Sequence, residues 1–229
     1  MSITKILNNK KMKTNQELQK DVQDAIKWEP LLNAAEIGVT AKDGVITLTG
    51  TVDSYSKKIE AENAAKNVSG VRALAEEIHI KYGDFGKKSD TDIAKEVLSA
   101  WKWNWEVPDQ KIKVKVESGV VTLDGELEWN YQREAAKKAI KNIAGIIDII
   151  SNIKIKSENH DVIERKAIEN ALERNSSIDD LGITVDVNGN YVTLKGTVNS
   201  FYARDEAEQI AWNAPGVWNV DNKLVIEYV

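Results

Sequence analysis

Cysteine is absent from this sequence, which excludes disulfide bonds and thiolate metal sites and leaves no signal of the redox compartment. With 3 prolines and 13 glycines, the composition is unlike that of a disordered or collagen-like chain. No run of about 18 apolar residues occurs, so we expect no transmembrane segment. The 229 residues, 42% hydrophobic and 29% charged, are therefore expected to form globular domains.

Motifs of catalysis and cofactor binding are also absent. The chain has no phosphate-binding loop, no GxGxxG and no HExxH. Its two histidines, His79 and His160, lack a serine or acidic partner at catalytic spacing and are expected to be structural or solvated. The pair Asp179 and Asp180 has too few ligands for a calcium loop. We therefore expect a protein that is not an enzyme and that holds no metal or cofactor.

Acidic residues outnumber basic ones by 36 to 31, which gives a formal net charge of −5. A nucleic-acid-binding domain normally carries a basic face, so we expect no nucleic-acid partner. Residues 1–12 form a short basic arm that lacks the apolar core of a secretory signal. This absence favours a cytoplasmic location, and the family resemblance given below supplies the alternative of a periplasmic or envelope-associated one.

An internal repeat dominates the sequence. The segments GVITLTGTVDSYSKKIEAENAAKNVSGV, GVVTLDGELEWNYQREAAKKAIKNIAGI and NYVTLKGTVNSFYARDEAEQIAWNAPGV begin at Gly44, Gly119 and Asn190 and align without gaps. We expect a domain at residues 13–82, a linker at 83–88, and further domains at 89–156 and 158–229. Because the second linker is the shorter one, we expect the second and third copies to be held closer together.

Each copy has the same pattern of hydrophobic residues. An amphipathic helix is followed by two strands of alternating polarity around a tight turn, an alanine-rich helix and a last strand. The order α-β-β-α-β predicts an α+β fold, in which two helices pack on one face of a three-stranded mixed sheet. Glycines recur at the end of the second strand and after the second helix, and we expect them to be structural: Gly50, Gly125 and Gly196, then Gly70, Gly145 and Gly216.

Tryptophan is the informative aromatic residue. Aligning the copies predicts that Trp101 is a core residue, and that Trp28 and Trp103 cover one end of the core. Other tryptophans stand mostly where another copy has a polar or charged residue, which indicates docking between repeats or a ligand or lipid surface: Trp105, Trp129, Trp212 and Trp218. We expect Trp212 to be partly buried against another repeat or chain. The remaining aromatics of this expected contact are Phe201, Tyr202 and Trp218 in the third copy, and Trp129 and Tyr131 in the second.

A basic stripe occurs in the second copy alone. Lys111, Lys113 and Lys115 alternate with apolar residues, so their ammonium groups are expected on the outward face of one strand. Two interpretations are open, an edge strand protected by lysine and a contact with an anion or acidic lipid.

The GVITLTGTV pattern, the charged and alanine-rich helix and the Gly-Val that opens the final strand resemble the BON (bacterial OsmY and nodulation) domain in three consecutive copies. The resemblance implies a non-catalytic module. It links the chain to osmotic and envelope stress, to phospholipid binding and, in one cytoplasmic branch, to potassium binding.

These observations predict a stress-associated or envelope-associated module that binds a phospholipid surface, a small anionic ligand or a protein partner through the second copy. The alternatives are an ion or small-ligand sensor, for example for potassium, and a structural scaffold; a homo-oligomer is also left open. The expected surface consists of Trp103, Trp105, Lys111, Lys113, Lys115, Trp129 and Tyr131.

Overall fold

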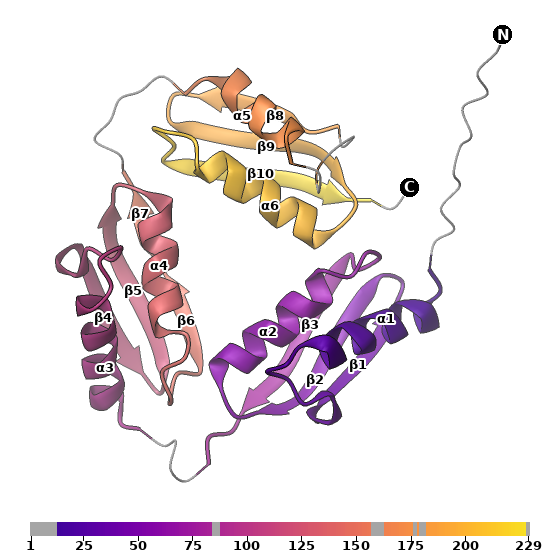
Figure 1. The fold of residues 1–229 in the computed structure, drawn as a ribbon, viewed down its shortest axis with the longest axis vertical. Helices are drawn as coiled ribbons and strands as arrows, with labels where there is room; N and C mark the ends of the chain where they lie inside the picture. Colours follow the sequence, from indigo (N-terminus) through magenta and orange to yellow (C-terminus); the bar gives the residue numbers. More distant parts are fainter. Residues whose placement is uncertain (1–12, 84–87, 157–162, 176–177, 179–181, 228–229) are drawn as a thin grey trace.

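The computed structural model describes residues 13–83, 88–156, 163–175, 178 and 182–227. The basic arm, His160 and the pair Asp179 and Asp180 lie outside the described residues. The chain forms three separate sheets, each with its own pair of helices (Figure 1), which confirms the α+β fold of three repeated units.

All three domains share one element order. The first contains α1 (Asn15–Trp28), η1 (Ala34–Glu36), β1 (Ile37–Lys42), β2 (Val45–Val52), α2 (Tyr55–Lys66) and β3 (Ala73–Ile80). The second contains α3 (Asp90–Lys102), η3 (Asp109–Lys111), β4 (Ile112–Glu117), β5 (Val120–Leu127), α4 (Asn130–Ile140), β6 (Asp148–Ser151) and β7 (Lys154–Ile155). The third contains α5 (Arg165–Glu173), β8 (Thr184–Asn188), β9 (Tyr191–Val198), α6 (Phe201–Trp212) and β10 (Asn219–Ile226).

The middle strand of each sheet is the second one in sequence. In the first domain β2 pairs antiparallel with β1 and parallel with β3, and β9 pairs in the same way with β8 and β10. In the second domain the parallel partner of β5 is interrupted at Asn152 and Ile153, which divides it into β6 and β7. The first helix of each domain buries its apolar stripe on this sheet, as Leu18, Val22 and Ile26 do in α1.

Local sequence explains where the elements begin and turn. Thr14 caps α1 in a reciprocal capping box with Glu17, and the Ser89 side chain accepts a hydrogen bond from the Asp92 amide at the start of α3. The turn between β1 and β2 has positive φ at both Asp43 and Gly44, the conformation that suits a two-residue hairpin.

The repeated strand glycine serves the backbone, although its position differs from our expectation. Gly50 lies inside β2, opposite Ile37, because β2 continues to Val52. Its φ is +138°, and a Cβ atom there would overlap the carbonyl oxygen of Glu36. Gly196 has the same role in the third domain, at a φ of +126°. Both glycines allow the first strand to start close to the second strand.

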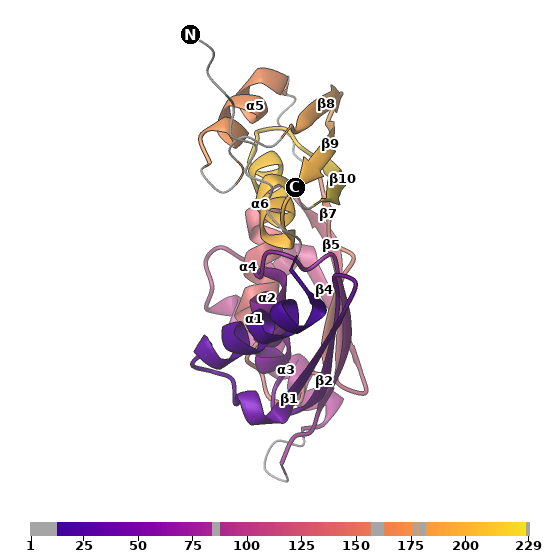
Figure 2. The same ribbon diagram turned by 90° about the vertical axis from the view of Figure 1, so that its right-hand side faces the viewer.

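The three domains form a closed triangle, with α2, α4 and α6 on its inner side (Figure 1). Viewed edge-on the triangle is flat, with α1 and α5 on one side and the strands on the other (Figure 2). Every pair of domains is in contact. Tyr55 is buried in the core of the second domain, Phe201 packs on the core of the first, and Trp212 packs on the core of the second.

The shorter linker does not produce the closest junction. Tyr55, Ile59 and Ile80 of the first domain all pack on the second domain, whereas Trp212 is the described apolar residue of the third domain that does so. An ion pair of 3.2 Å between Lys141 and Glu60 adds to the first junction. The longer first linker therefore does not prevent Tyr55 from inserting into the second domain.

Candidate functional site

The turn between α3 and η3 carries two tryptophans that are almost completely exposed. Trp103 has 86% and Trp105 has 89% of its surface in solvent. The prediction that Trp28 and Trp103 cover the core is therefore wrong, since Trp28 is also 84% exposed. Trp101 is fully buried, as expected, and its Nε1 donates to the Ala136 carbonyl at 3.0 Å. Trp101 fills that end of the core, and Trp103 follows α3 as its C-cap residue.

Hydrogen bonds fix the shape of this turn. The Asn104 amide donates to the Trp101 carbonyl at 2.9 Å, and the Val107 amide donates to the Asn104 carbonyl at 3.0 Å. The Asn104 side chain accepts from the Glu106 amide at 3.0 Å, and Val107 is buried in the core below. The two indoles therefore project into solvent from a segment that is anchored on both sides.

The first domain carries a related apolar turn. Trp28 occupies the position of Trp103 in its own copy, and Leu31 beside it is also exposed. An exposed indole after the first helix is therefore common to the first two domains.

The predicted lysine stripe is largely neutralised. Lys113 and Lys115 project from the outward face of β4, which is an edge strand, whereas Lys111 ends the short helix η3. Lys111 pairs with Glu128 at 2.7 Å and Lys115 pairs with Glu117 at 2.9 Å. Lys113 lies in register with Asp124 of β5. This arrangement has the features of a protected edge strand.

The aromatic residues of the third domain lie partly at the junctions. Trp212 is half-buried, and the guanidinium of Arg133 lies 4.5 Å from the centre of its ring. Arg133 thus stacks on Trp212 where we expected Trp129 or Tyr131. Trp129 is half-buried at the start of α4, while Tyr131 and Tyr202 are about half-exposed.

Burial perturbs a few titratable groups, all of them near the inner helices. Burial raises the pKa of Tyr55 to about 12 and also raises the pKa of Glu62. Burial raises the pKa of Asp205 in α6, and the positive charge of Lys66 in α2 opposes that shift. Tyr55 lies at the junction of the first and second domains, the charges that act on Glu62 are all in the first domain, and His79 lies apart on β3.

Metal-binding groups and membrane-spanning helices both bear on function, and neither occurs among the described residues. Within the described ranges, no group of three or more histidine, aspartate or glutamate residues is placed to hold a metal ion. Among the helices that the structure describes, none is long and apolar enough to cross a membrane.

Comparison with known proteins identifies the repeated unit. A model of the BON domain matches residues 14–82, 89–157 and 160–228. The osmotically-inducible protein Y of Escherichia coli (strain K12) is 27% identical over 129 residues, which cover 55% of this chain and 64% of that protein. A 21 kDa hemolysin of Actinobacillus pleuropneumoniae is 31% identical over 138 residues, 59% of this chain and 67% of that protein. The chain therefore spans about two thirds of the length of these relatives. Because the family model matches most of the sequence in three consecutive copies, the chain belongs to the BON domain family.

Proposed function

We propose that this protein is a non-catalytic binding protein that attaches to phospholipid surfaces through the turn between α3 and η3. The observation that carries the proposal is the exposure of Trp103 and Trp105 on an anchored turn. Leaving two indoles in water is unfavourable, and an apolar or interfacial partner removes that cost. A tryptophan ring with its N–H suits the boundary between lipid headgroups and acyl chains.

The surrounding residues support a lipid over a purely apolar partner. Lys102 precedes Trp103 and Lys27 precedes Trp28, and both lysines are exposed. Lysines near an interface are attracted to anionic headgroups, by about 1 kcal/mol each. The single basic stripe contributes less than the sequence indicated, because Lys111 and Lys115 are paired with carboxylates. We therefore propose that tryptophan insertion supplies most of the affinity and that lysine adds a preference for anionic lipid.

The family supports the same class of function. BON domains are linked to osmotic stress and to phospholipid binding, and the protein Y that this chain resembles is named for its osmotic induction. Trp28 is an equivalent exposed indole in the first domain and would give the chain a second point of contact with a lipid surface.

Vesicle co-sedimentation tests the proposal. The full chain is mixed with vesicles of phosphatidylcholine, with and without phosphatidylglycerol, at low salt. We expect binding that is stronger on the anionic vesicles, a blue shift of tryptophan emission, and at least tenfold weaker binding by the Trp103→Ser/Trp105→Ser variant. Tyr202→Ser is the control, since Tyr202 is an exposed aromatic residue outside the turn. The proposal is wrong if neither vesicle binds the protein or if the control loses as much affinity.

Potassium sensing predicts a different result. A sensor would show a rise in melting temperature with potassium and not with sodium. That result in the absence of vesicle binding would favour the sensor.

A further inference from the structure

One position of the repeat supplies an aromatic side chain to two of the domain junctions but not to the junction between the second and third domains. Tyr55, Asn130 and Phe201 are equivalent in the repeat, and each begins the second helix of its domain. Tyr55 inserts into the core of the second domain and Phe201 packs on the core of the first. Asn130 is the first residue of α4, and this end of α4 lies toward the third domain (Figure 1). Its side chain is shorter than that of tyrosine or phenylalanine and cannot fill the same space.

An open cleft lies at this junction. It consists of two hollows of about 330 and 400 Å³, and the stacked pair of Arg133 and Trp212 lines both of them. We call them the smaller and the larger hollow. Each is lined by residues of both domains, and the larger one has the volume of a small-molecule site.

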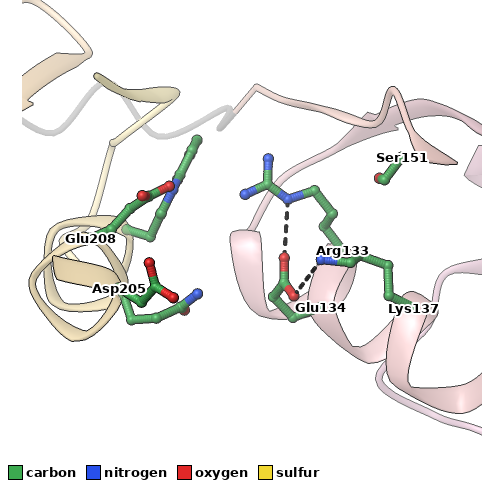
Figure 3. A pocket seen from close by; sticks show the side chains of 8 residues that line it. Arg133, Glu134, Lys137, Ser151, Asp205 and Glu208 are labelled. Atoms are coloured by element: carbon green, nitrogen blue, oxygen red, sulfur yellow. Dashed lines mark hydrogen bonds and ion pairs between the residues drawn. The ribbon is translucent and has the colours of Figure 1, made fainter. Parts of the chain in front are cut away.

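The two hollows differ in charge. Figure 3 shows Asp205 and Glu208 of the third domain facing Arg133 and Glu134 across the smaller hollow. The larger hollow contains Arg133, Lys154 and Lys156 against one carboxylate, that of Glu126. The larger hollow is therefore the basic one.

Unpaired polar atoms gather at the same junction. Among the described residues, four buried side-chain atoms have no hydrogen-bond partner: Asn130 Oδ1, Ser151 Oγ, Trp212 Nε1 and Trp218 Nε1. Trp212 and Trp218 line the larger hollow, and Ser151 lines the smaller one. A buried polar atom without a partner is unfavourable, so this junction is less well satisfied than a domain core.

We infer that the larger hollow binds a small organic anion that carries a flat ring. Arg133, Lys154 and Lys156 attract the phosphate or carboxylate group of the ligand. The flat ring packs against the aromatic side chains of Tyr191 and Trp218. Since the ligand contacts both domains, its binding holds the third domain against the second. This site is separate from the turn that carries Trp103 and Trp105, and the inference does not depend on lipid binding.

Titration calorimetry on the full chain tests the inference with four probes. Adenosine monophosphate and indole-3-acetate supply a ring with a phosphate or a carboxylate, adenosine lacks the charge, and inorganic phosphate lacks the ring. We expect at least one of the two ring-bearing anions to bind ten times more tightly than adenosine and phosphate, and to raise the melting temperature. If adenosine monophosphate binds and indole-3-acetate does not, the anionic group of the ligand is a phosphate. The reverse result identifies a carboxylate.

Two variants locate the site. Lys154→Gln removes a charge and Trp218→Leu removes an aromatic ring from the larger hollow, and each is expected to weaken binding at least fivefold. Lys113→Gln and Trp105→Leu make the same changes away from the cleft and are expected to bind as the unaltered chain does. Circular dichroism checks that each variant is folded. The inference is overturned if neither ring-bearing anion binds, or if the two control variants lose as much affinity as the two cleft variants.

Discussion

Tyr55 and Phe201 occupy equivalent positions in the first and third copies, and each packs onto the core of a neighbouring domain. Tyr55 is the first residue of α2 and Phe201 is the first residue of α6, and both helices lie on the inner side of their domains. Lys141 at the end of α4 meets Glu60 within α2, and Trp212 at the end of α6 meets Arg133 near the start of α4. The contacts are thus head-to-tail, and a rotation repeated three times closes them into a triangle.

Removing the Tyr55 side chain should separate the first two domains and destabilise both. Tyr55 is only 9% exposed and lies within the core of the second domain. Truncation of a buried aromatic residue costs about 3 kcal/mol or more, so Tyr55→Ala should lower the free energy of unfolding by that amount. Urea denaturation followed by circular dichroism measures it. Tyr131→Ala is the control, because Tyr131 is half-exposed, and its effect should stay below about 0.5 kcal/mol.

The buried phenol of Tyr55 should make stability depend on pH in the alkaline range. Burial raises its pKa to about 12 in the folded chain, whereas the unfolded value is about 10. Between these values the unfolded chain has lost a proton that the folded chain retains, so the free energy of unfolding falls as pH rises. Tyr55→Phe removes this group, and its stability should fall less steeply between pH values of about 9.5 and 11.5. Parallel slopes for the two proteins would contradict the prediction.

Alanine at Gly50 should be costly although it adds a single methyl group. The φ of +138° disfavours any side chain, and the new Cβ would overlap the Glu36 carbonyl. We expect Gly50→Ala to lower the free energy of unfolding by about 2 kcal/mol or more. Gly83→Ala is the matched control, since no atom lies within 4 Å of a Cβ placed there. Thermal unfolding of the two variants should therefore differ clearly, and equal melting temperatures would refute the structural role of Gly50.

Trp101 and Trp103 are two residues apart, but replacing Trp101 should destabilise the chain far more than replacing Trp103. Trp101→Phe leaves a cavity and removes the 3.0 Å hydrogen bond to the Ala136 carbonyl, so a loss of about 2 kcal/mol or more is expected. Trp103→Phe changes a side chain that is exposed and should leave stability within about 0.5 kcal/mol. The ranking is tested by denaturant titration, and it fails if Trp103→Phe is the more destabilising change.

The fold could be predicted from the sequence because the same pattern of apolar residues and turns occurs in all three copies. Periodicity in each copy identified helices and strands, and the Asp43-Gly44 turn and the strand glycine marked where the backbone needs special conformations. Trp101 was assigned to the core correctly because the other copies have aliphatic residues there.

Alignment was less informative wherever a residue contacts another copy or no residue at all. Trp28 and Trp103 are equivalent and large, which favoured a role in the core, but the core is already full at that end and both rings are exposed. The roles of Tyr55 and Asn130 depend on how the domains are placed, which no pattern within one copy encodes. The comparison of Tyr55, Asn130 and Phe201 at one repeat position was the signal in the sequence that could have indicated an altered junction.

Restoring an aromatic residue at Asn130 should close the cleft between the second and third domains. Asn130 is 4% exposed and its Oδ1 has no hydrogen-bond partner, so the present side chain is unfavourable where it lies. Asn130→Tyr introduces the side chain that inserts at the equivalent junction of the first domain.

We expect the melting temperature to rise, because the ring buries apolar surface between two domains and the unpaired amide is lost. We also expect binding of the ring-bearing anions to weaken, because closing the cleft leaves less room for the ring. Asn130→Ala is the control: it removes the unpaired oxygen without filling the junction, so any gain in stability that both variants share comes from the amide alone. A lower melting temperature for Asn130→Tyr than for Asn130→Ala would show that the junction has no room for an aromatic side chain.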